Sequence, residues 1–283
     1  MILENLLLSK DLILLSGYFL IFQWFAISQV THSKCTPYFN SKVFDRKMNQ
    51  DSESLNKYIS SKGLCSRRVA DKWIEQGRVT INGEPAVKGN RVFPGDSVSI
   101  DGKILDVKVD FVYMLFNKPP GITCTTDRND KSNIIDYINF EKRIFPIGRL
   151  DKNSTGLIML TNDGDIVNRI LREENYHEKE YIVKVDAPIS RSFISKMSRP
   201  IPMLGKKTLP CRVSQINKRV FSIILTQGMN RQIRRMCDYC GYGVISLKRI
   251  RIMHMKLGNL KVGEWRFLTK KEFRELQNQI ADQ

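Results

Sequence analysis

The chain has 283 residues, of which 42% are hydrophobic, and its 46 Lys and Arg against 29 Asp and Glu give a formal net charge of +17. This length suits about two domains, and the hydrophobic share excludes a largely disordered chain. The positive charge favours a polyanionic partner. We expect nucleic acid ahead of membrane, because the basic residues are spread over segments patterned like helices and strands.

The six cysteines have no spacing typical of a disulfide framework, so we expect a protein of the reducing cytoplasm. Cys237 and Cys240 have the spacing of half a zinc site. No second pair accompanies them and the three histidines are scattered, so we expect no metal.

Residues 1–47 differ from the rest, since residues 12–27 are almost unbroken apolar sequence. This run is short for a membrane span, which needs about 20 residues. A membrane anchor, a signal peptide and an extension upstream of a true start at Met48 all remain open. We favour the extension, expect it to lie outside the fold, and expect no membrane attachment despite residues 12–27.

Residues 53–102 are predicted to form a small domain. Apolar residues at helical spacing predict a helix within 53–63, and a second over 67–76 with Ser66 as its N-cap and Gly77 as its stop. Strands and turns then follow as far as residue 100. In the second helix the apolar face is predicted to hold Val69, Ala70, Trp73 and Ile74.

The opposite face of this second helix is basic. Arg67, Arg68 and Lys72, followed by Arg78, can form a cationic ridge for RNA phosphates, or simply a solvated surface. The segments 55–59, 65–68, 74–83 and 94–96 resemble the S4-like RNA-binding domain. That resemblance implies a structured RNA as partner.

After a charged connector over 103–110, residues 111–283 are predicted to form a larger domain. Strands and helices occur there without a regular βαβ alternation, which predicts an α+β fold with a largely antiparallel mixed sheet flanked by helices. Strands are expected at 111–116, 144–147, 156–161, 180–185, 211–226 (a hairpin) and 244–252. Helices are expected at 133–139, 163–171, 190–197, 230–240 and 269–280. Neither a Walker nor a dinucleotide-binding fingerprint is present.

The loop at 148–157 carries Arg149 and Asp151 between two predicted strands. Such a loop holds a carboxylate on a rigid scaffold while leaving it reachable, although an ordinary surface turn has the same pattern. We expect Lys152, Asn153 and Ser154 to provide loop spacing or RNA backbone contacts.

The segment 228–236 offers partners for this carboxylate. Asn230 can cap a helix in which Arg234 lies on the border of the buried face, where it can reach a carboxylate and hold it ionised. Arg231 and Arg235 point outward and can bind phosphates. A basic surface helix is the alternative.

Tyr181 begins an apolar strand. A tyrosine there is either part of the core or a stacking surface for a base.

The segments 148–157, 179–181 and 230–236, together with the turn at 117–121, resemble in order and spacing the motifs of RNA pseudouridine synthases. The segments 225–230, 249–253 and 263–266 resemble the branch that modifies 23S rRNA, some members of which also act on tRNA. This implies isomerisation of uridine to pseudouridine without a cofactor. Asp151 would be the essential carboxylate, Arg234 its partner, and Tyr181 the residue that stacks on the flipped base.

The resemblance also implies an RNA-binding set in which Arg149 fills the gap left by the flipped base or binds a phosphate. Its other members are Arg67, Arg68, Lys72, Arg78, Lys118, Arg231 and Arg235. We expect a cytoplasmic monomer. Whether Asp151 attacks the sugar or acts on it as a base stays open, as does the target uridine. A non-catalytic RNA-binding or ribosome-assembly factor is the rival hypothesis, and a membrane-attached RNA binder a weaker one.

Overall fold

The computed structural model describes residues 52–281, so the interpretation of residues 1–47 lies outside the described range. Within residues 52–281, none of the helices combines the length and apolar character needed to cross a bilayer.

Residues 53–105 build a unit with its own hydrophobic core, which includes Leu55, Ile59, Ala70 and Ile74. Two helices, α3 (Leu55–Ser61) and α4 (Arg67–Glu75), accompany a sheet in the order β3-β2-β5-β6 and the pair β1-β4. The strands are β1 (Glu53–Ser54), β2 (Val79–Ile81), β3 (Glu84–Pro85), β4 (Arg91–Val92), β5 (Val98–Ile100) and β6 (Lys103–Ile104).

The predicted boundaries of α4 are confirmed. The Ser66 side chain accepts a hydrogen bond from the Val69 N–H, and Gly77 follows the helix with a left-handed φ of +69°. The prediction that Val69 faces the core is wrong, because it is 37% exposed. A helix of nine residues buries only a narrow stripe, here Ala70 and Ile74.

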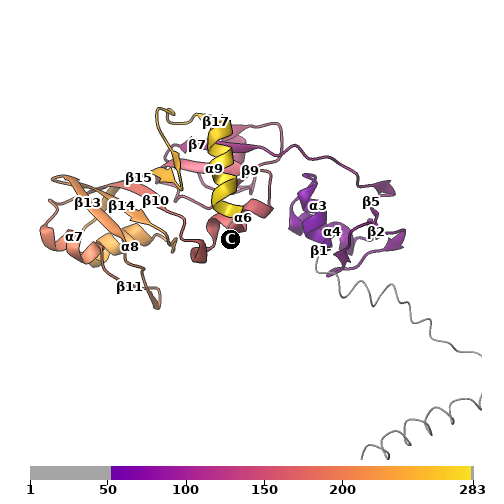
Figure 1. The fold of residues 1–283 in the computed structure, drawn as a ribbon, viewed down its shortest axis with the longest axis horizontal. Coiled ribbons are helices and arrows are strands. Elements are labelled where there is room, and N and C mark those ends of the chain that lie inside the picture. Colours follow the sequence, from indigo (N-terminus) through magenta and orange to yellow (C-terminus); the bar gives the residue numbers. More distant parts are fainter. Residues whose placement is uncertain (1–51, 282–283) are drawn as a thin grey trace, which may run out of the picture. The chain divides into compact units, whose positions relative to one another are not determined.

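The larger unit is built on a nine-stranded sheet with the main order β13-β14-β10-β15-β9-β7-β17, to which β16 and β8 add at β15 and β9 (Figure 1). Between its strands only the β9–β15 pairing is parallel, so the predicted antiparallel character is confirmed. The strands are β7 (Tyr113–Lys118), β8 (Phe145–Ile147), β9 (Thr155–Thr161), β10 (Lys179–Val185), β13 (Arg212–Asn217), β14 (Val220–Leu225), β15 (Val244–Ile252), β16 (Met255–Lys256) and β17 (Trp265–Phe267).

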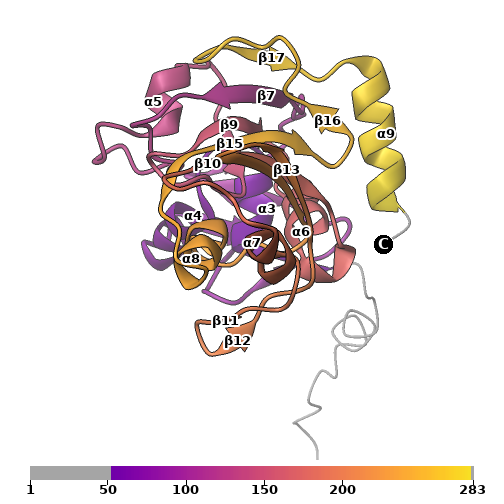
Figure 2. The same cartoon turned by 90° about the vertical axis from the view of Figure 1, so that its left-hand side faces the viewer.

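Helices cover both faces of this sheet. α7 (Arg191–Met197) and α8 (Gln232–Tyr239) lie on one side of the β13–β15 half, as Figures 1 and 2 both show. The short α5 (Ile134–Ile138) packs into the same core, whereas α6 (Asp165–Leu171) and α9 (Lys270–Ala281) pack into the core of the opposite face. A 3-10 turn (Glu173–Asn175) precedes β10, and β11 (Pro202–Met203) and β12 (Lys206–Lys207) form a small hairpin after α7. Leu171, the last residue of α6, is 39% exposed.

Strand β9 connects the two halves of the sheet, since it pairs with β7, β8 and β15. Gly156 lets the backbones of β9 and β15 approach closely. Its φ is +102°, and a Cβ there would lie 2.2 Å from the Arg249 carbonyl oxygen. The loop just before β9 is therefore seated against the middle of the sheet, which is where the cavity described next lies.

Candidate active site

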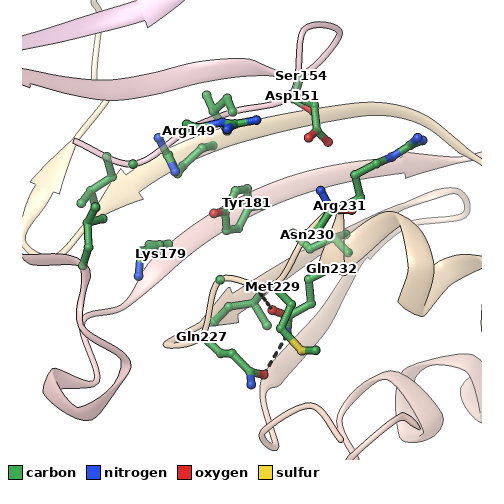
Figure 3. A pocket seen from close by; sticks show the side chains of 18 of the residues that line it. Arg149, Asp151, Ser154, Lys179, Tyr181, Gln227, Met229, Asn230, Arg231 and Gln232 are labelled. Atoms are coloured by element: carbon green, nitrogen blue, oxygen red, sulfur yellow. Dashed lines mark hydrogen bonds between the residues drawn. The ribbon is translucent and has the colours of Figure 1, made fainter. Parts of the chain in front are cut away.

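A cavity of about 530 Å³ opens beside the loop that precedes β9. Its walls come from that loop, from the start of β10, from β15 and from the segment that leads into α8. In Figure 3, Asp151 lies on the loop, Tyr181 on β10, and residues Met229 to Gln232 along another side. Asp151, Tyr181 and Arg234, which are far apart in the sequence, all line this cavity.

Arg234 reaches Asp151 as the helical projection predicts. Its Nε lies 3.6 Å from Asp151 Oδ2, and the two side chains are 15% and 40% exposed respectively. The guanidinium is held from behind, because it donates to the Val244 carbonyl and to Ser154 Oγ, each at 3.3 Å. Asp151 is thus a partly exposed carboxylate beside a cation whose position is fixed by other contacts.

Ser154 is 1% exposed, so of its two expected roles, loop spacing and RNA contact, its burial contradicts only the second. Its hydroxyl accepts from Arg234 Nη2, and its backbone N–H donates to the Asp151 carbonyl at 2.9 Å. The side chain therefore positions Arg234 relative to the loop.

The start of α8 differs from the prediction that Asn230 caps the helix. Arg231 occupies the N-cap position with a left-handed φ of +50° and makes no side-chain cap. Gln232 orders this turn instead: its Oε1 accepts from the Met229 N–H at 3.0 Å, and its Nε2 donates to Gln227 Oε1 at 3.3 Å (Figure 3). Asn230 uses both its carbonyl and its side-chain oxygen to accept from Arg235.

Tyr181 is 9% exposed and packs into the hydrophobic core, yet it also lines the cavity. Arg249 lies opposite it on β15, with the guanidinium carbon 6.0 Å from the centre of the tyrosine ring. Both readings of Tyr181, core residue and stacking surface, are compatible with this position.

Lys179 lies two residues before Tyr181 on the same face of β10 and also lines the cavity. Its ammonium donates to the carbonyls of His177 at 3.0 Å and Thr226 at 3.4 Å. Burial, together with the nearby charge of Arg249, lowers the pKa of Lys179 from 10.5 to about 8, and Glu173 acts in the opposite direction.

Lys118 is wrongly placed among the RNA-binding residues, because its side chain is fully buried. The ammonium donates to the carbonyls of Pro119 at 2.9 Å, Ile122 at 2.8 Å and Lys152 at 3.0 Å. Burial lowers the pKa of Lys118, whereas Cys124 and Asp151 act to raise it. All three protons of the ammonium are used, so Lys118 ties the turn after β7 to the loop that carries Asp151.

The other predicted cations are distributed over two regions. Arg149 and Arg231 are exposed and line the cavity, and Arg235 is exposed on α8. Arg67, Arg68 and Lys72 are exposed on α4 in the smaller unit. In the same unit Arg78 is engaged by a bidentate contact to Asp101, at 2.9 and 2.6 Å, and lies over the Trp73 ring.

Sequence reasoning assigned no role to Lys179 or to Arg249. The strand alternation could have indicated both residues. Lys179 lies two residues from the buried Tyr181, and Arg249 lies two residues from the buried Leu247. A cation at such a position points toward the core side of the sheet. Among residues 52–281 no three His, Cys, Asp or Glu side chains cluster in a way that could hold a metal ion.

Comparisons with known proteins agree with this architecture. Residues 53–98 match the S4 domain, and residues 112–239 match the family described as RNA pseudouridylate synthase. A crystal structure titled as a pseudouridylate synthase superposes with a TM-score of 0.58 at 29% identity, covering 79% of this chain and 99% of that one.

Two curated relatives show how far the similarity extends. The dual-specificity RNA pseudouridine synthase RluF of Escherichia coli strain K12 is 52% identical over 224 residues, which cover 78% of this chain and 77% of RluF. The ribosomal large subunit pseudouridine synthase B of Bacillus subtilis strain 168 is 34% identical over 233 residues, covering 79% of this chain and 95% of the relative.

Proposed function

The chain belongs to the RNA pseudouridine synthases, and we propose that it isomerises one uridine of 23S ribosomal RNA and another in a tRNA, with Asp151 as the essential carboxylate. In this reaction the bond between N1 of uracil and C1′ of ribose breaks and a bond between C5 and C1′ forms. The proton leaves C5 and N1 regains one, so the reaction needs no oxidant or reductant.

The observation that carries the assignment of Asp151 is its position beside Arg234 in the wall of the cavity. A carboxylate that acts on a sugar, as nucleophile or as base, reacts as the anion, and the guanidinium fixed beside it orients that anion in the cavity. Arg234 is fixed by Ser154 and by the Val244 carbonyl, so it serves as the partner of Asp151 rather than as a phosphate ligand. Tyr181 then supplies an aromatic surface in the same cavity for the uracil ring.

A cavity of about 530 Å³ suits one nucleotide rather than a helix. The target must therefore leave its stack before it reaches Asp151, as substrates of base-modifying enzymes do. Arg149 and Arg231, exposed where they line the cavity, are placed to bind the phosphates on either side of the flipped nucleotide or to fill its gap. The basic face of α4 in the S4 domain adds affinity that does not depend on sequence.

The choice of RNA rests on the relatives. One is named for the large ribosomal subunit, and the more similar one for dual specificity. We place the reaction in the cytoplasm, in keeping with free cysteines throughout the described residues. We further propose that the enzyme acts as a monomer.

The role of Asp151 is tested by tritium release from RNA that carries 5-tritiated uridine. We expect the wild type and Asp106→Asn, a change in the exposed connector, to release tritium equally, and Asp151→Asn to release none above background. Equal release from Asp151→Asn would refute the proposed role. No release by the wild type from either rRNA or tRNA would refute the activity and favour a non-catalytic RNA binder.

The substrate is identified by mapping pseudouridines in 23S rRNA and tRNA from a strain that lacks the gene, with and without a plasmid copy. One site lost from each class of RNA, and restored by the wild type but not by Asp151→Asn, is the expected result. A loss confined to one class would refute dual specificity while leaving the activity intact.

A further inference from the structure

The cavity has two positively charged walls, and the proposed function uses only one of them. Arg234 stands beside Asp151, whereas Lys179 and Arg249 lie with Tyr181 on the face of the sheet. Lys179 precedes Tyr181 by two residues, and Arg249 is its direct cross-strand neighbour. We call Lys179 and Arg249 the inner cation pair.

Arg249 has hydrogen-bonding capacity that the described residues leave unused. The residue is 4% exposed, and its Nε donates to the Leu157 carbonyl at 2.6 Å. Its Nη2 is buried and has no acceptor among residues 52–281. A buried donor without a partner costs about 1–3 kcal/mol, so such a group in a cavity wall points to a ligand acceptor. Arg249 lines the cavity, so a ligand bound there is the candidate acceptor for this donor.

Lys179 in the same wall has one N–H group without an acceptor among residues 52–281. Its ammonium carries three N–H groups, and two of them are used by the carbonyls of His177 and Thr226. The burial of this ammonium beside a second cation is unfavourable, which the lowered pKa reflects. An acceptor with negative charge, placed between Lys179 and Arg249, relieves both costs.

Resting on the proposed function, we propose that the inner cation pair binds a carbonyl oxygen of the flipped uracil and stabilises the negative charge that the base acquires when its bond to ribose breaks. The electron pair of the N1–C1′ bond passes to the uracil, where it is shared by N1, O2 and O4. This holds whether Asp151 attacks the sugar or acts on it as a base. The negative charge of the base disappears when C5 bonds to C1′. Loss of the proton from C5 and protonation of N1 then give the neutral pseudouridine.

Depth in the cavity favours the base over a phosphate as the ligand. Arg249 is almost fully buried, whereas the exposed cations that line the cavity are Arg149 and Arg231. In a flipped nucleotide the base enters the pocket first and the phosphates stay at the surface. A preorganised donor at a developing oxyanion accelerates the chemical step about 10²–10³-fold without a matching gain in ground-state binding.

The test compares Lys179→Met with Lys184→Met, the same substitution at an exposed position of the same strand. The substrate is a synthetic RNA that contains the uridine mapped for the wild type. We expect Lys179→Met to lower the single-turnover rate about 10²-fold while the dissociation constant for RNA changes less than about twofold. Lys184→Met should match the wild type in both quantities.

A change in the substrate identifies the contact without altering the fold. The same RNA is made with 2-thiouridine or 4-thiouridine at the target, because sulfur is a weaker hydrogen-bond acceptor than oxygen. One of the two thio-substituted RNAs should react about tenfold more slowly than the unmodified RNA with the wild type. The same substitution should not lower the single-turnover rate of Lys179→Met or of Arg249→Lys any further. Arg249→Lys keeps the positive charge of the side chain. Circular dichroism of this variant checks separately that the sheet remains folded.

Three results would overturn the proposal. The first is a thio effect of equal size in wild type and variants. The second is a loss of RNA affinity at an unchanged single-turnover rate, which would assign the inner cation pair to phosphate. The third is full activity of both variants. Each of them leaves wild-type turnover of unmodified uridine intact, so failure of this inference is distinguishable from failure of the proposed function.

Discussion

Lys118→Met tests whether a buried ammonium holds the loop of Asp151 in place. The substitution keeps the length and apolar character of the side chain and removes the donor to three carbonyls, including that of Lys152, the residue next to Asp151. A hydrogen bond to a charged group contributes about 1.5–3 kcal/mol, so the three together contribute about 5–9 kcal/mol before the cost of burying the ammonium. That cost is several kcal/mol.

The net loss of stability expected for Lys118→Met is therefore about 3 kcal/mol. Typical domains have about 5–15 kcal/mol, so the variant should still fold at low temperature. A shift of about 1 Å in a catalytic group can cost roughly 10²-fold in rate, and we expect a loss of that size in the single-turnover rate. RNA affinity should stay within about twofold of the wild type, because the side chain is fully buried.

Urea unfolding, single-turnover kinetics and RNA binding, each measured beside Lys108→Met in the exposed connector, distinguish the two roles of Lys118. If Lys118 bound phosphate, its replacement would weaken RNA binding and reduce the salt dependence of the dissociation constant, while stability stayed constant. That pattern would refute the reasoning from burial, as would a variant with unchanged stability and rate.

Two further substitutions test what holds the sheet together. Bidentate hydrogen bonds from Arg266 at 2.7 Å lower the pKa of Glu272 from 4.5 to about 2, so its contribution of about 3 kcal/mol is present above pH 4.5 and disappears as the pH falls toward 2. Glu272→Gln should lower the free energy of unfolding at pH 7, measured by urea titration. Between pH 5 and 2 this free energy should decline less steeply than in the wild type, and an equally steep decline would contradict the assignment. Gly156→Ala places a Cβ against the Arg249 backbone and should cost more than about 3 kcal/mol. Gly95→Ala, with a similar positive φ and open space, should cost only about 1 kcal/mol, and equal losses would show that φ alone matters.

The longer elements were predictable because each contains several repeats of its pattern. The strand expected over 244–252 coincides with β15, and the α4 helix agrees with its prediction to one residue. The short strands β11, β12 and β16 have two residues each, too few for alternation to be recognised, and pairing with neighbours determines them. The hairpin over 211–226 was predicted because its strands have six residues each.

Within the site, predictability depended on whether a contact follows from helical geometry. The proximity of Arg234 to Asp151 followed from its place on the border of an amphipathic helix. The burial of Lys118 had no such signature, because its three acceptors are backbone carbonyls, which every residue possesses. The predicted Asn230 cap did not form, because its side-chain oxygen accepts from Arg235 Nη2 and the helix begins one residue later, with Arg231 at the N-cap position.

The net charge of +17 includes buried cations that bind the backbone and exposed cations that face solvent. Lys118, Arg234 and Arg249 are mostly buried, and each donates to a backbone carbonyl, of Lys152, Val244 and Leu157 respectively. Such cations are largely withdrawn from solvent, so they release few counterions when RNA binds. Only the exposed set contributes to the salt dependence of affinity. Composition alone therefore overestimates the electrostatic component of RNA binding. Composition also does not reveal where these cations lie. Those buried around Asp151 and Tyr181 make the interior of the cavity positive, and we propose that this stabilises the anionic base as it leaves the sugar.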